Sequence, residues 1–585
     1  MVNRAWPWVV ACLLCGARDG NGGGHDGDHG DGWGRTCEWT QWGQSASHDG
    51  EVCVEGDSGL RMLARLVVDP FAEQATAEAG GSLLVHYPAP LIDKHGNVFV
   101  LEKSGSYVSC DPPGSGEPFP CGPATRNQQI WNVRAYEWHH DQLRARWTFE
   151  SDWKPLPTPW EPMFQPAMDD RFLYVPGAGG TVFKISKRNG VVRERINPFG
   201  GTIDPNTYVA GGITIDRDGT LLYNVNQIDP VDPLFTDARS WLIKVSQRGR
   251  IRSVDYRTLI PGAPQATDLC YANFGWLDPP PPQPWPPLPQ PDGSPTLPPQ
   301  FPCLSQRAAV NITPAVGRDG TIFTVSRAHS ISANDYGYIV ALRPNLELKW
   351  ATSLRGILDD GCGIMVPYGT GPFDCREGAA EGVDPTTNQL PSAQAIDIGS
   401  SSPTALPDGG VLYGGFTGYN GFRGHLIKLD RKGRFSGSFD FGWDVTPALY
   451  QHDDTYSIIV KDNYYFDNGP FLVTQLDADL QVEWQFANTS TETCERLPDG
   501  TIECEDTGQH PNGFEWCINA PAVDRNGTVY GLNEDGYMYA IGQGGVELER
   551  FFLTRTLTAA YTPLSIDTRG RIYTQNNGEL YVLGD

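Results

Sequence analysis

The stretch that decides the fold is APAVDRNGTVYGLNEDGYMYAI, which runs from Ala520 to Ile541. It begins at Pro521, passes through a polar turn that ends in Gly527, and continues as two short segments rich in alternating apolar residues. Proline has no backbone N–H and suits the first residue of a strand, and Asn-Gly tolerates the positive φ of a tight turn. The stretch therefore predicts antiparallel strands joined by tight turns.

The same pattern occurs eight times along the chain. Proline anchors seven copies, and an isoleucine takes its place in the third; the anchors are Pro90, Pro166, Ile213, Pro314, Pro403, Pro447, Pro521 and Pro563. Several copies close with a fourth apolar segment that ends in Trp, such as DLQVEW at Trp484. Four antiparallel strands per repeat are typical of one propeller blade. The sequence thus predicts an all-β, eight-bladed β-propeller.

The last repeat is too short for a complete blade. Only 23 residues run from Pro563 to Asp585, which suffices for three strands. A sheet that lacks its outer strand exposes unpaired backbone groups. The segment LRMLARLVV, from Leu60 to Val68, is apolar and precedes the first full repeat. We expect this N-terminal strand to close the ring.

The spacing of the anchors predicts long insertions between some blades, and each of these insertions should be crosslinked by a disulfide. Three gaps span 42 to 47 residues, which fits one blade, whereas the four long gaps each contain a close cysteine pair. A crosslink stabilises a long loop by restricting the unfolded chain. Cys517 also falls in the last long gap, so three pairings are open there. The predicted pairs are Cys110 with Cys121, Cys270 with Cys303, Cys362 with Cys375, and Cys494 with Cys504.

The N-terminal region predicts export from the cytoplasm. Residues 1–17 resemble a short bacterial export signal, and residues 18–36 form a Gly-, Asp- and His-rich flexible tether. A lipid anchor at Cys12 or Cys15 and ordinary cleavage after Ala17 remain alternatives. Residues 37–59 form a small lead-in that Cys37 and Cys53 staple, and residues 60–585 form the propeller. Disulfides agree with an extracytoplasmic site, either as an outer-membrane lipoprotein of a bacterial cell envelope or as a secreted protein.

Charge and composition limit the partners. Asp and Glu total 70 against 44 Lys and Arg, a formal net charge of −26, which argues against nucleic acid and against a basic membrane-binding patch. Membrane contact is then expected only through an N-terminal lipid. A proline-rich run from Asp278 to Pro302 is either a docking segment for a partner or a stiff loop. We expect a monomer that binds a protein or glycan partner through its long loops.

The repeats resemble those of the pyrroloquinoline-quinone (PQQ)-type propellers. The resemblance rests on TPAVGRDGTIFTVS, from Thr313 to Ser326, on the opening stretch, and on the tryptophan-containing lead-in EWTQWGQSASHDG, from Glu38 to Gly50. The superfamily includes quinoprotein alcohol dehydrogenases and the outer-membrane assembly lipoprotein BamB. It implies an eight-bladed fold, and for the dehydrogenases it implies PQQ and Ca²⁺ at the centre of the ring.

The chain departs from the dehydrogenase pattern. It has no adjacent cysteine pair, and ALRPNLELKW at Trp350 lacks the Thr-Gly of the family's tryptophan-docking motif. We therefore assign no catalytic residue, no cofactor and no metal site, and expect a non-enzymatic binding or scaffold protein, with cell-envelope assembly as one such role. The alternative is a PQQ- and Ca²⁺-dependent dehydrogenase acting on alcohols or sugars.

A small ligand would bind at the central channel, which the innermost strands of a propeller line. The residues just before the anchors are mostly small and all neutral: Ala89, Gln165, Gly212, Thr313, Ser402, Thr446, Ala520 and Thr562. Residues slightly earlier in the chain should line the mouth of the channel. The predicted ligand-binding residues are Asn311, Ser401, Asp444 and Asn519.

Overall fold

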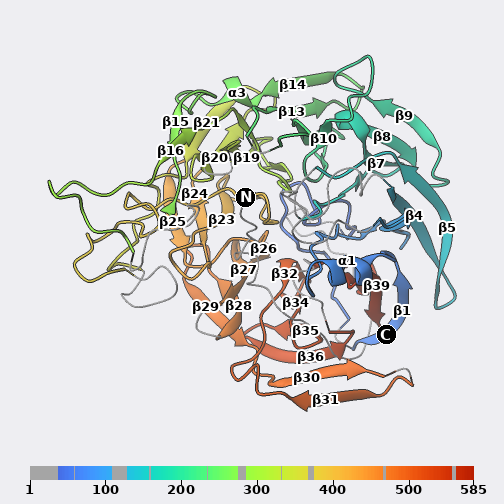
Figure 1. Cartoon of the computed structure of the whole chain (residues 1–585). Helices are drawn as coiled ribbons and strands as arrows, with labels where there is room; N and C mark the ends of the chain where they lie inside the picture. Colours follow the sequence, from blue (N-terminus) through green and yellow to red (C-terminus); the bar gives the residue numbers. More distant parts are fainter. Residues whose placement is uncertain are drawn as a thin grey trace.

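The chain forms a ring of eight β-sheets around a central axis (Figure 1). The computed structural model describes residues 37–585 except 58, 109–127, 157–159, 234, 275–284, 331–332, 366–374, 466–468, 498 and 556–561. Each sheet follows one sequence anchor, so we number the blades 1 to 8 in the order of the anchors. The predicted all-β, eight-bladed β-propeller is confirmed.

Blades 1 to 3 run outward from the axis in sequence order, and in blade 3 two short strands share the innermost place. Blade 1 contains β2 (Leu91–Ile92), β3 (Val98–Gly105), β4 (Gln129–His139) and β5 (Gln142–Ser151). Blade 2 contains β6 (Ala167–Met168), β7 (Phe172–Gly177), η1 (Ala178–Gly180), β8 (Thr181–Ser186) and β9 (Val192–Ile196). Blade 3 contains β10 (Thr207–Val209), β11 (Thr214–Ile215), β12 (Leu221–Gln227), β13 (Arg239–Val245) and β14 (Ile251–Asp255).

Blades 4 to 6 repeat this order, and blade 4 again has two short inner strands. Blade 4 contains β17 (Gln306–Ala308), β18 (Ala315–Val316), β19 (Ile322–Ala328), β20 (Gly337–Leu342) and β21 (Leu348–Ser353). Blade 5 contains β22 (Thr404–Ala405), β23 (Val411–Gly415), β24 (His425–Leu429) and β25 (Phe435–Phe439). Blade 6 contains β26 (Ala448–His452), β27 (Thr455–Asn463), β28 (Phe471–Leu476) and β29 (Val482–Ala487).

Blades 7 and 8 close the ring with segments from both ends of the described chain. Blade 7 contains β33 (Ala522–Val523), β34 (Val529–Leu532), β35 (Tyr537–Gly542) and β36 (Val546–Phe552). Blade 8 contains β32 (Ile518–Ala520), β37 (Thr562–Ile566), β38 (Ile572–Asn576), β39 (Glu579–Gly584) and β1 (Arg61–Val67).

The predicted N-terminal closing strand is confirmed. Strand β1 pairs antiparallel with the C-terminal strand β39, from Arg61 opposite Gly584 to Val67 opposite Glu579, and the C-terminus lies beside β1 in Figure 1. Arg65 also forms an ion pair with Glu579 at 2.8 Å across this seam. The strand supplies the outer partner that the short last repeat lacks.

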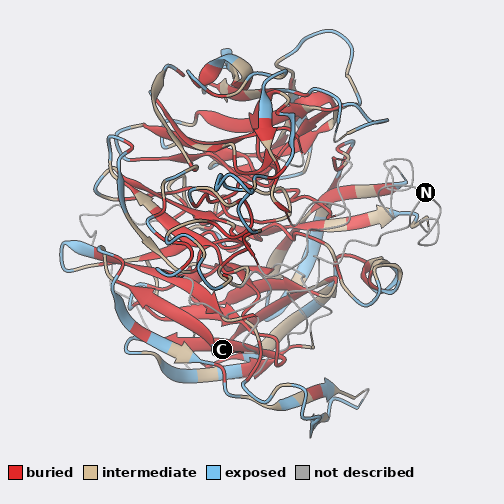
Figure 2. Ribbon diagram, turned by 60° about the vertical axis from the view of Figure 1, so that its left-hand side comes forward, coloured by how far each residue is buried: buried red, intermediate tan, exposed pale blue. Residues whose placement is uncertain are grey.

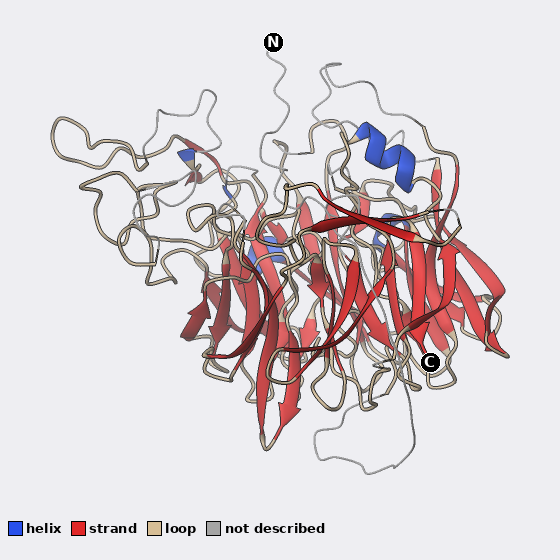
Figure 3. Ribbon diagram, turned by 90° about the horizontal axis from the view of Figure 1, so that it is seen from below, coloured by secondary structure: helices blue, strands red, loops and turns tan. Residues whose placement is uncertain are grey.

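The two faces of the ring differ. Each inner strand ends in a tight turn such as Asp524 to Gly527, where the Gly527 N–H donates to the Asp524 carbonyl at 3.0 Å. We call this side the turn face. The connections from each outer strand to the next blade lie on the opposite side, the loop face, which also carries α1 (Ala72–Glu78) (Figure 3).

The lead-in follows the inner ends of the blades in order around the ring. In each of blades 1 to 7 the backbone N–H of the residue two after the anchor donates to a lead-in oxygen, at 2.6 to 2.9 Å. The acceptors belong to Trp39, Thr40, Gln41, Ala46, Ser47, Asp49 and Gly50. For blade 8, the Asp57 N–H donates to the Gly570 carbonyl at 2.8 Å. The lead-in therefore joins all eight blades at the turn face.

Gly50 shows how closely the lead-in follows the blades. Its φ is +65°, and a Cβ placed on it would lie 2.8 Å from the Ala448 side chain and 2.9 Å from the Pro521 carbonyl oxygen. A larger residue fits neither this backbone conformation nor this space. A glycine is needed where the lead-in passes from blade 6 to blade 7.

Disulfides pin the described insertions as the sequence predicts. The pairs that the structure describes are Cys37–Cys53, Cys270–Cys303, Cys362–Cys375 and Cys494–Cys504. Of the three pairings open in the last long gap, the structure therefore has Cys494 with Cys504. Cys517 forms a disulfide too, with none of these eight cysteines.

Some predictions for cysteines and for the N-terminus fall on other parts of the chain. The predicted pair of Cys110 with Cys121 lies outside the described residues, because residues 109–127 are not among them, so this pairing stays a prediction. The anchor candidates Cys12 and Cys15, the export signal and the tether lie outside the described residues as well.

Two of the described disulfides stabilise hairpins outside the blades. Strands β15 (Leu269–Tyr271) and β16 (Gln300–Pro302) pair in the insertion after blade 3, which begins with the short helix α3 (Tyr256–Leu259). Strands β30 (Glu492–Arg496) and β31 (Ile502–Asp506) pair after blade 6, with Cys494 directly opposite Cys504. Figure 1 places the second hairpin outside β36.

The core lies between the blades. Strand residues are mainly buried, and exposed positions gather on outer strands and loops (Figure 2). One cluster joins the lead-in to blades 1, 7 and 8 through residues such as Trp42, Ile92, Val523 and Ile566. Among the described residues, no helix is long and apolar enough to cross a membrane.

We expect Trp39→Ala to lower the free energy of unfolding by about 3–5 kcal/mol, because it removes a fully buried indole from the segment that joins the blades. Denaturant unfolding of the oxidised protein measures this. Glu55→Ala is the matched control, since Glu55 is exposed and forms a surface ion pair with Arg525. It should change stability by less than about 0.5 kcal/mol. Equal effects of the two changes would contradict the role of the lead-in.

Candidate functional site at the channel mouth and its loop rim

The predicted ring of residues around the channel forms a belt of hydrogen bonds. The backbone N–H of Gly212 donates to the Thr313 hydroxyl at 3.1 Å, that of Thr313 to Ser402 at 3.0 Å, and that of Ser402 to Thr446 at 3.0 Å. The Thr446 N–H then donates to the Asn519 carbonyl at 2.8 Å. These ring positions connect neighbouring blades, and their small polar side chains are used for that purpose.

Three of the four predicted ligand-binding residues lie close together between blades 4 and 6. Ser401 and Asp444 line the same small cavity of about 10 Å³, and the Val445 N–H donates to the Ser401 hydroxyl at 3.3 Å. The Asn311 amide donates to the carbonyl of Gly399, which lines the same cavity, at 3.2 Å. This space holds about one water molecule. Their assignment as ligand-binding residues stays a prediction.

Asp444 is paired with a buried lysine. Its carboxylate lies 3.2 Å from Nζ of Lys461, and both side chains are completely buried. The Ser400 hydroxyl donates to the same carboxylate at 3.1 Å. Removing one partner of such a pair leaves a buried charge, which is strongly unfavourable. The pair therefore fixes the inner edge of blades 5 and 6.

Asn519, the fourth predicted residue, differs from the others. Its side chain is completely buried on β32, and neither its amide oxygen nor its amide nitrogen has a hydrogen-bond partner among the described residues. Its backbone carbonyl joins the belt through Thr446. A buried amide without partners is rare in folded proteins and indicates that water or a ligand completes it.

Two further sets of buried charges are also paired. Nζ of Lys103 lies 2.7 Å from Asp69 and 2.8 Å from Glu161. The Asp397 carboxylate forms ion pairs with two buried guanidinium groups. Its oxygen lies 2.5 Å from a nitrogen of Arg307 and 3.1 Å from a nitrogen of Arg327. These arginines hold the pKa of Asp397 far below its usual range, against the opposing effect of burial.

The described residues do not fit PQQ with Ca²⁺. PQQ carries several carboxylates and needs cations, and Ca²⁺ needs a set of oxygen ligands that are not already neutralised. The cations named above each hold a carboxylate of the chain, and the described residues contain no group of three or more Asp, Glu, His or Cys that could bind a metal ion. We therefore derive no reaction step through this cofactor.

The insertions after blades 3 and 4 pack on one another and form a second candidate site, the loop platform. We define it as the described residues 256–274, 285–305, 354–365 and 375–402. Trp285 is buried and forms a β-bridge with Cys375, and Arg376 donates to the Pro286 carbonyl at 2.8 Å. The Phe274 N–H also donates to the Thr386 carbonyl at 2.7 Å. The proline-rich run is thus attached to the neighbouring disulfide loop.

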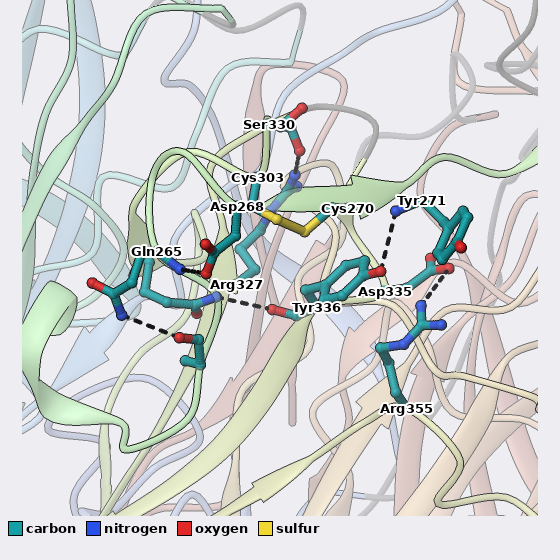
Figure 4. Close-up of a disulfide and its surroundings, with 12 residues drawn as sticks. Gln265, Asp268, Cys270, Tyr271, Cys303, Arg327, Ser330, Asp335, Tyr336 and Arg355 are labelled. Carbon is teal, nitrogen blue, oxygen red and sulfur yellow. Dashed lines mark hydrogen bonds and ion pairs between the residues drawn. A yellow bond between two sulfur atoms is a disulfide. The ribbon is translucent and has the colours of Figure 1, made fainter. Parts of the chain in front are cut away.

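A network beside Cys270–Cys303 connects the platform to blade 4 (Figure 4). The Tyr271 N–H donates to the Tyr336 hydroxyl at 3.1 Å, and Arg355 lies 3.6 Å from Asp335. Arg327 donates to the Ser330 carbonyl at 2.9 Å while it also holds Asp397. The hairpin, the channel mouth and the second insertion therefore share one set of side chains.

The platform exposes large apolar side chains. Leu288 is 71% exposed, Leu390 is 70% exposed and Leu269 is 57% exposed. The Leu288 carbonyl accepts from Thr296 at 2.6 Å, and Asn388 donates to the Thr296 carbonyl at 3.2 Å, so the two insertions meet between Leu288 and Leu390. Beside Leu390, an open hollow of about 370 Å³ is lined by Arg355, Gly356 and Gln389. Exposed apolar groups on a fixed base are typical of interaction surfaces.

Two buried acids have raised pKa values, Asp384 in the platform and Asp335 beside it in blade 4. Burial raises the pKa of Asp384 to about 7, and the neighbouring carboxylates of Asp335 and Asp360 add to this, while hydrogen bonds from Thr386 oppose it. Burial also raises the pKa of Asp335 to about 6, against the effect of Arg355 and Arg327. Folding therefore makes both acids harder to ionise than an exposed aspartate.

Comparison with known proteins shows similarity of fold only. The chain is similar to quinohemoprotein alcohol dehydrogenase from Comamonas testosteroni, at 10% identity over 94% of this chain and 81% of that chain, with a TM-score of 0.48. It is also similar to BamB from Moraxella catarrhalis, at 10% identity over 90% of this chain and 100% of that chain, with a TM-score of 0.36. No family model matches the sequence. No curated protein matches it either.

The sequence did not indicate several residues of these sites. Lys461, Arg327 and Asp397 come from different elements, and no spacing pattern links them. Trp285 stands within the proline-rich run, and its burial against the next insertion follows from tertiary packing that no local pattern predicts.

We expect the stability of the platform to fall as the pH rises from about 4 to 7. The raised pKa of Asp384 means that the folded protein binds more protons than the unfolded chain in this window, so the stabilisation is complete below the unfolded pKa of about 4 and is lost as the pH passes 7. Limited proteolysis of the platform across this range measures it. Asp384→Asn should flatten the profile, and an unchanged slope in that variant would contradict the assignment.

Proposed function

We propose that the chain is an extracytoplasmic, non-enzymatic binding or scaffold protein of the bacterial cell envelope. The loop platform is the observation that carries this proposal, because it presents exposed apolar side chains on a base fixed by Trp285 and two disulfides. Binding residues commonly sit on loops that a rigid scaffold positions. The partner is a protein or glycan that contacts the face around Leu288 and Leu390.

The proposed location rests on the disulfides and on the N-terminal sequence. Several disulfides are typical of proteins outside the reducing cytoplasm. A lipid on Cys12 or Cys15 would hold the protein at the outer membrane, while cleavage after Ala17 would release it.

A photo-crosslinking residue at position 288, in the full chain expressed in its envelope, tests this proposal. We expect a crosslinked partner that is lost when Leu390→Asp places a charge in the same surface. Position 526 is the matched control, since Asn526 is exposed on the turn face. Crosslinks of equal strength at both positions, or crosslinks at 288 that survive Leu390→Asp, would reject the platform as the binding surface.

The alternative function is a PQQ- and Ca²⁺-dependent dehydrogenase acting on alcohols or sugars. Calorimetric titration of the purified protein with PQQ and Ca²⁺, together with dye reduction on such substrates, separates the two. We expect no stoichiometric binding and no dye reduction, because the mouth carries its charges in pairs such as Lys461 with Asp444. Binding with dye reduction would replace the proposed function by the alternative.

A further inference from the structure

Arg355 and Leu390 both line the open hollow of about 370 Å³ in the loop platform. The backbone around them is held on both sides of the insertion. Arg355 forms a β-bridge with Ser392. The N–H of Gly356 donates to the Pro391 carbonyl at 2.9 Å. The lining of the hollow is therefore fixed by the fold, and a fixed hollow can select a ligand by shape and charge.

Two neighbours orient the Arg355 guanidinium. It lies over the Tyr336 ring, 4.4 Å from the ring centroid, and it donates to Oε1 of Gln389 at 3.0 Å. The side chain is 24% exposed, so the guanidinium can be reached from outside the protein. A planar guanidinium that is already held in place loses little further freedom when it binds an anion.

The ion pair that Arg355 makes with its own chain is loose. Nη1 of Arg355 lies 3.6 Å from Oδ2 of Asp335, which is longer than a hydrogen bond (Figure 4). This carboxylate oxygen is buried and has no hydrogen-bond partner among the described residues. By comparison, Arg307 lies 2.5 Å from Asp397. Arg355 can therefore bind a carboxylate from outside the chain at a shorter distance than the one it has.

Apolar side chains continue from the hollow across the platform. Leu390 lines the hollow and is mainly exposed, and so is Leu288 on the neighbouring insertion. The hydrogen bonds of Leu288 and Asn388 to Thr296 hold the two insertions side by side. A cation with apolar surface beside it is complementary to a carboxylate that apolar side chains flank.

The charge of the whole chain narrows the choice of partner further. A formal net charge of −26 repels polyanions, so a single carboxylate in an otherwise neutral segment fits this surface better. A neutral glycan offers no charge to the guanidinium. Because the hollow is open, a side chain can enter it while the segment that carries it continues toward Leu288, whereas a chain end would stop at the hollow.

We propose that the hollow binds the carboxylate of an Asp or Glu side chain in an extended, otherwise apolar segment of a partner protein. The carboxylate pairs with Arg355, and the neighbouring apolar side chains of the segment cover Leu390 and Leu288. Arginine and carboxylate can form two parallel hydrogen bonds, which give orientation as well as affinity. The inference rests on the proposed function, because it names the chemistry of the partner at the same platform.

Peptide selection on the purified, oxidised protein tests the proposal. The probe is a library of random octapeptides with amidated C-termini, and fluorescence polarisation measures the affinity of the selected peptides. We expect the binders to carry one Asp or Glu flanked by apolar residues. Arg355→Gln should weaken the best binder by at least about tenfold, because it removes the charge that the carboxylate contacts. Arg355→Glu should shift the selection toward peptides with Lys or Arg.

Two control variants separate binding from folding. Arg343→Gln removes an exposed arginine from the turn between β20 and β21 of the same blade, and it should leave the affinity unchanged. Arg355→Gln combined with Asp335→Asn should weaken binding as much as Arg355→Gln alone. The double variant should melt at the same temperature as the single one or higher, because it leaves no buried carboxylate without its counter-charge.

Three results would overturn the proposal: no binders, binders without an acidic residue, or acidic binders that Arg355→Gln does not weaken. A second library with free C-terminal carboxylates tests a chain end as the occupant. If only this library gives binders that depend on Arg355, a chain end occupies the hollow and the side-chain assignment is wrong.

Crosslinking at position 288 in the envelope reports on the proposed function separately. A crosslinked partner together with a failed peptide selection would leave the platform as a binding surface for another chemistry, such as a glycan. Absence of any crosslink would reject the proposed function, whatever the peptides show.

Discussion

The structure depends on the hydrogen bonds that satisfy the inner edges of the blades. A ring of eight sheets brings short inner strands to its centre, where water is largely excluded and an unpaired N–H is costly. The lead-in supplies oxygen acceptors to blades 1 to 7 in turn, and the hydroxyls of Thr313, Ser402 and Thr446 join neighbouring blades. The centre is therefore held by the chain's own polar groups.

A ring fixed in this way tolerates long insertions. The cost of closing a loop rises slowly with its length, so connections of very different size attach to the same blade frame. The insertions after blades 3 and 4 add order of their own through Trp285, Cys270–Cys303 and Cys362–Cys375. They become a shaped surface, and the apolar side chains of Leu288 and Leu390 remain exposed because they lie outside the core of the blades.

The sequence predicted what local rules determine. The anchors and their turns predicted eight blades, the short last repeat predicted strand β1, and close cysteine pairs predicted the described disulfides. It did not predict contacts between distant elements. Strand β32 directly precedes blade 7 in the chain yet joins the sheet of blade 8, and only this step brings Asn519 beside Thr562. The packing of Trp285 on Cys375 is equally non-local.

Charge is distributed in a way that limits what the centre of the ring can do. The chain carries a formal net charge of −26, yet three of its buried carboxylates, Asp444, Asp397 and Asp69, each contact a lysine or arginine. Such ion pairs hold the surrounding side chains in place. Separating one pair to bind a charged ligand would leave the other charged side chain buried without a counter-charge, which is strongly unfavourable. The buried charges of these pairs are consequently used within the fold, whereas exposed apolar side chains such as Leu288 and Leu390 lie on the loops.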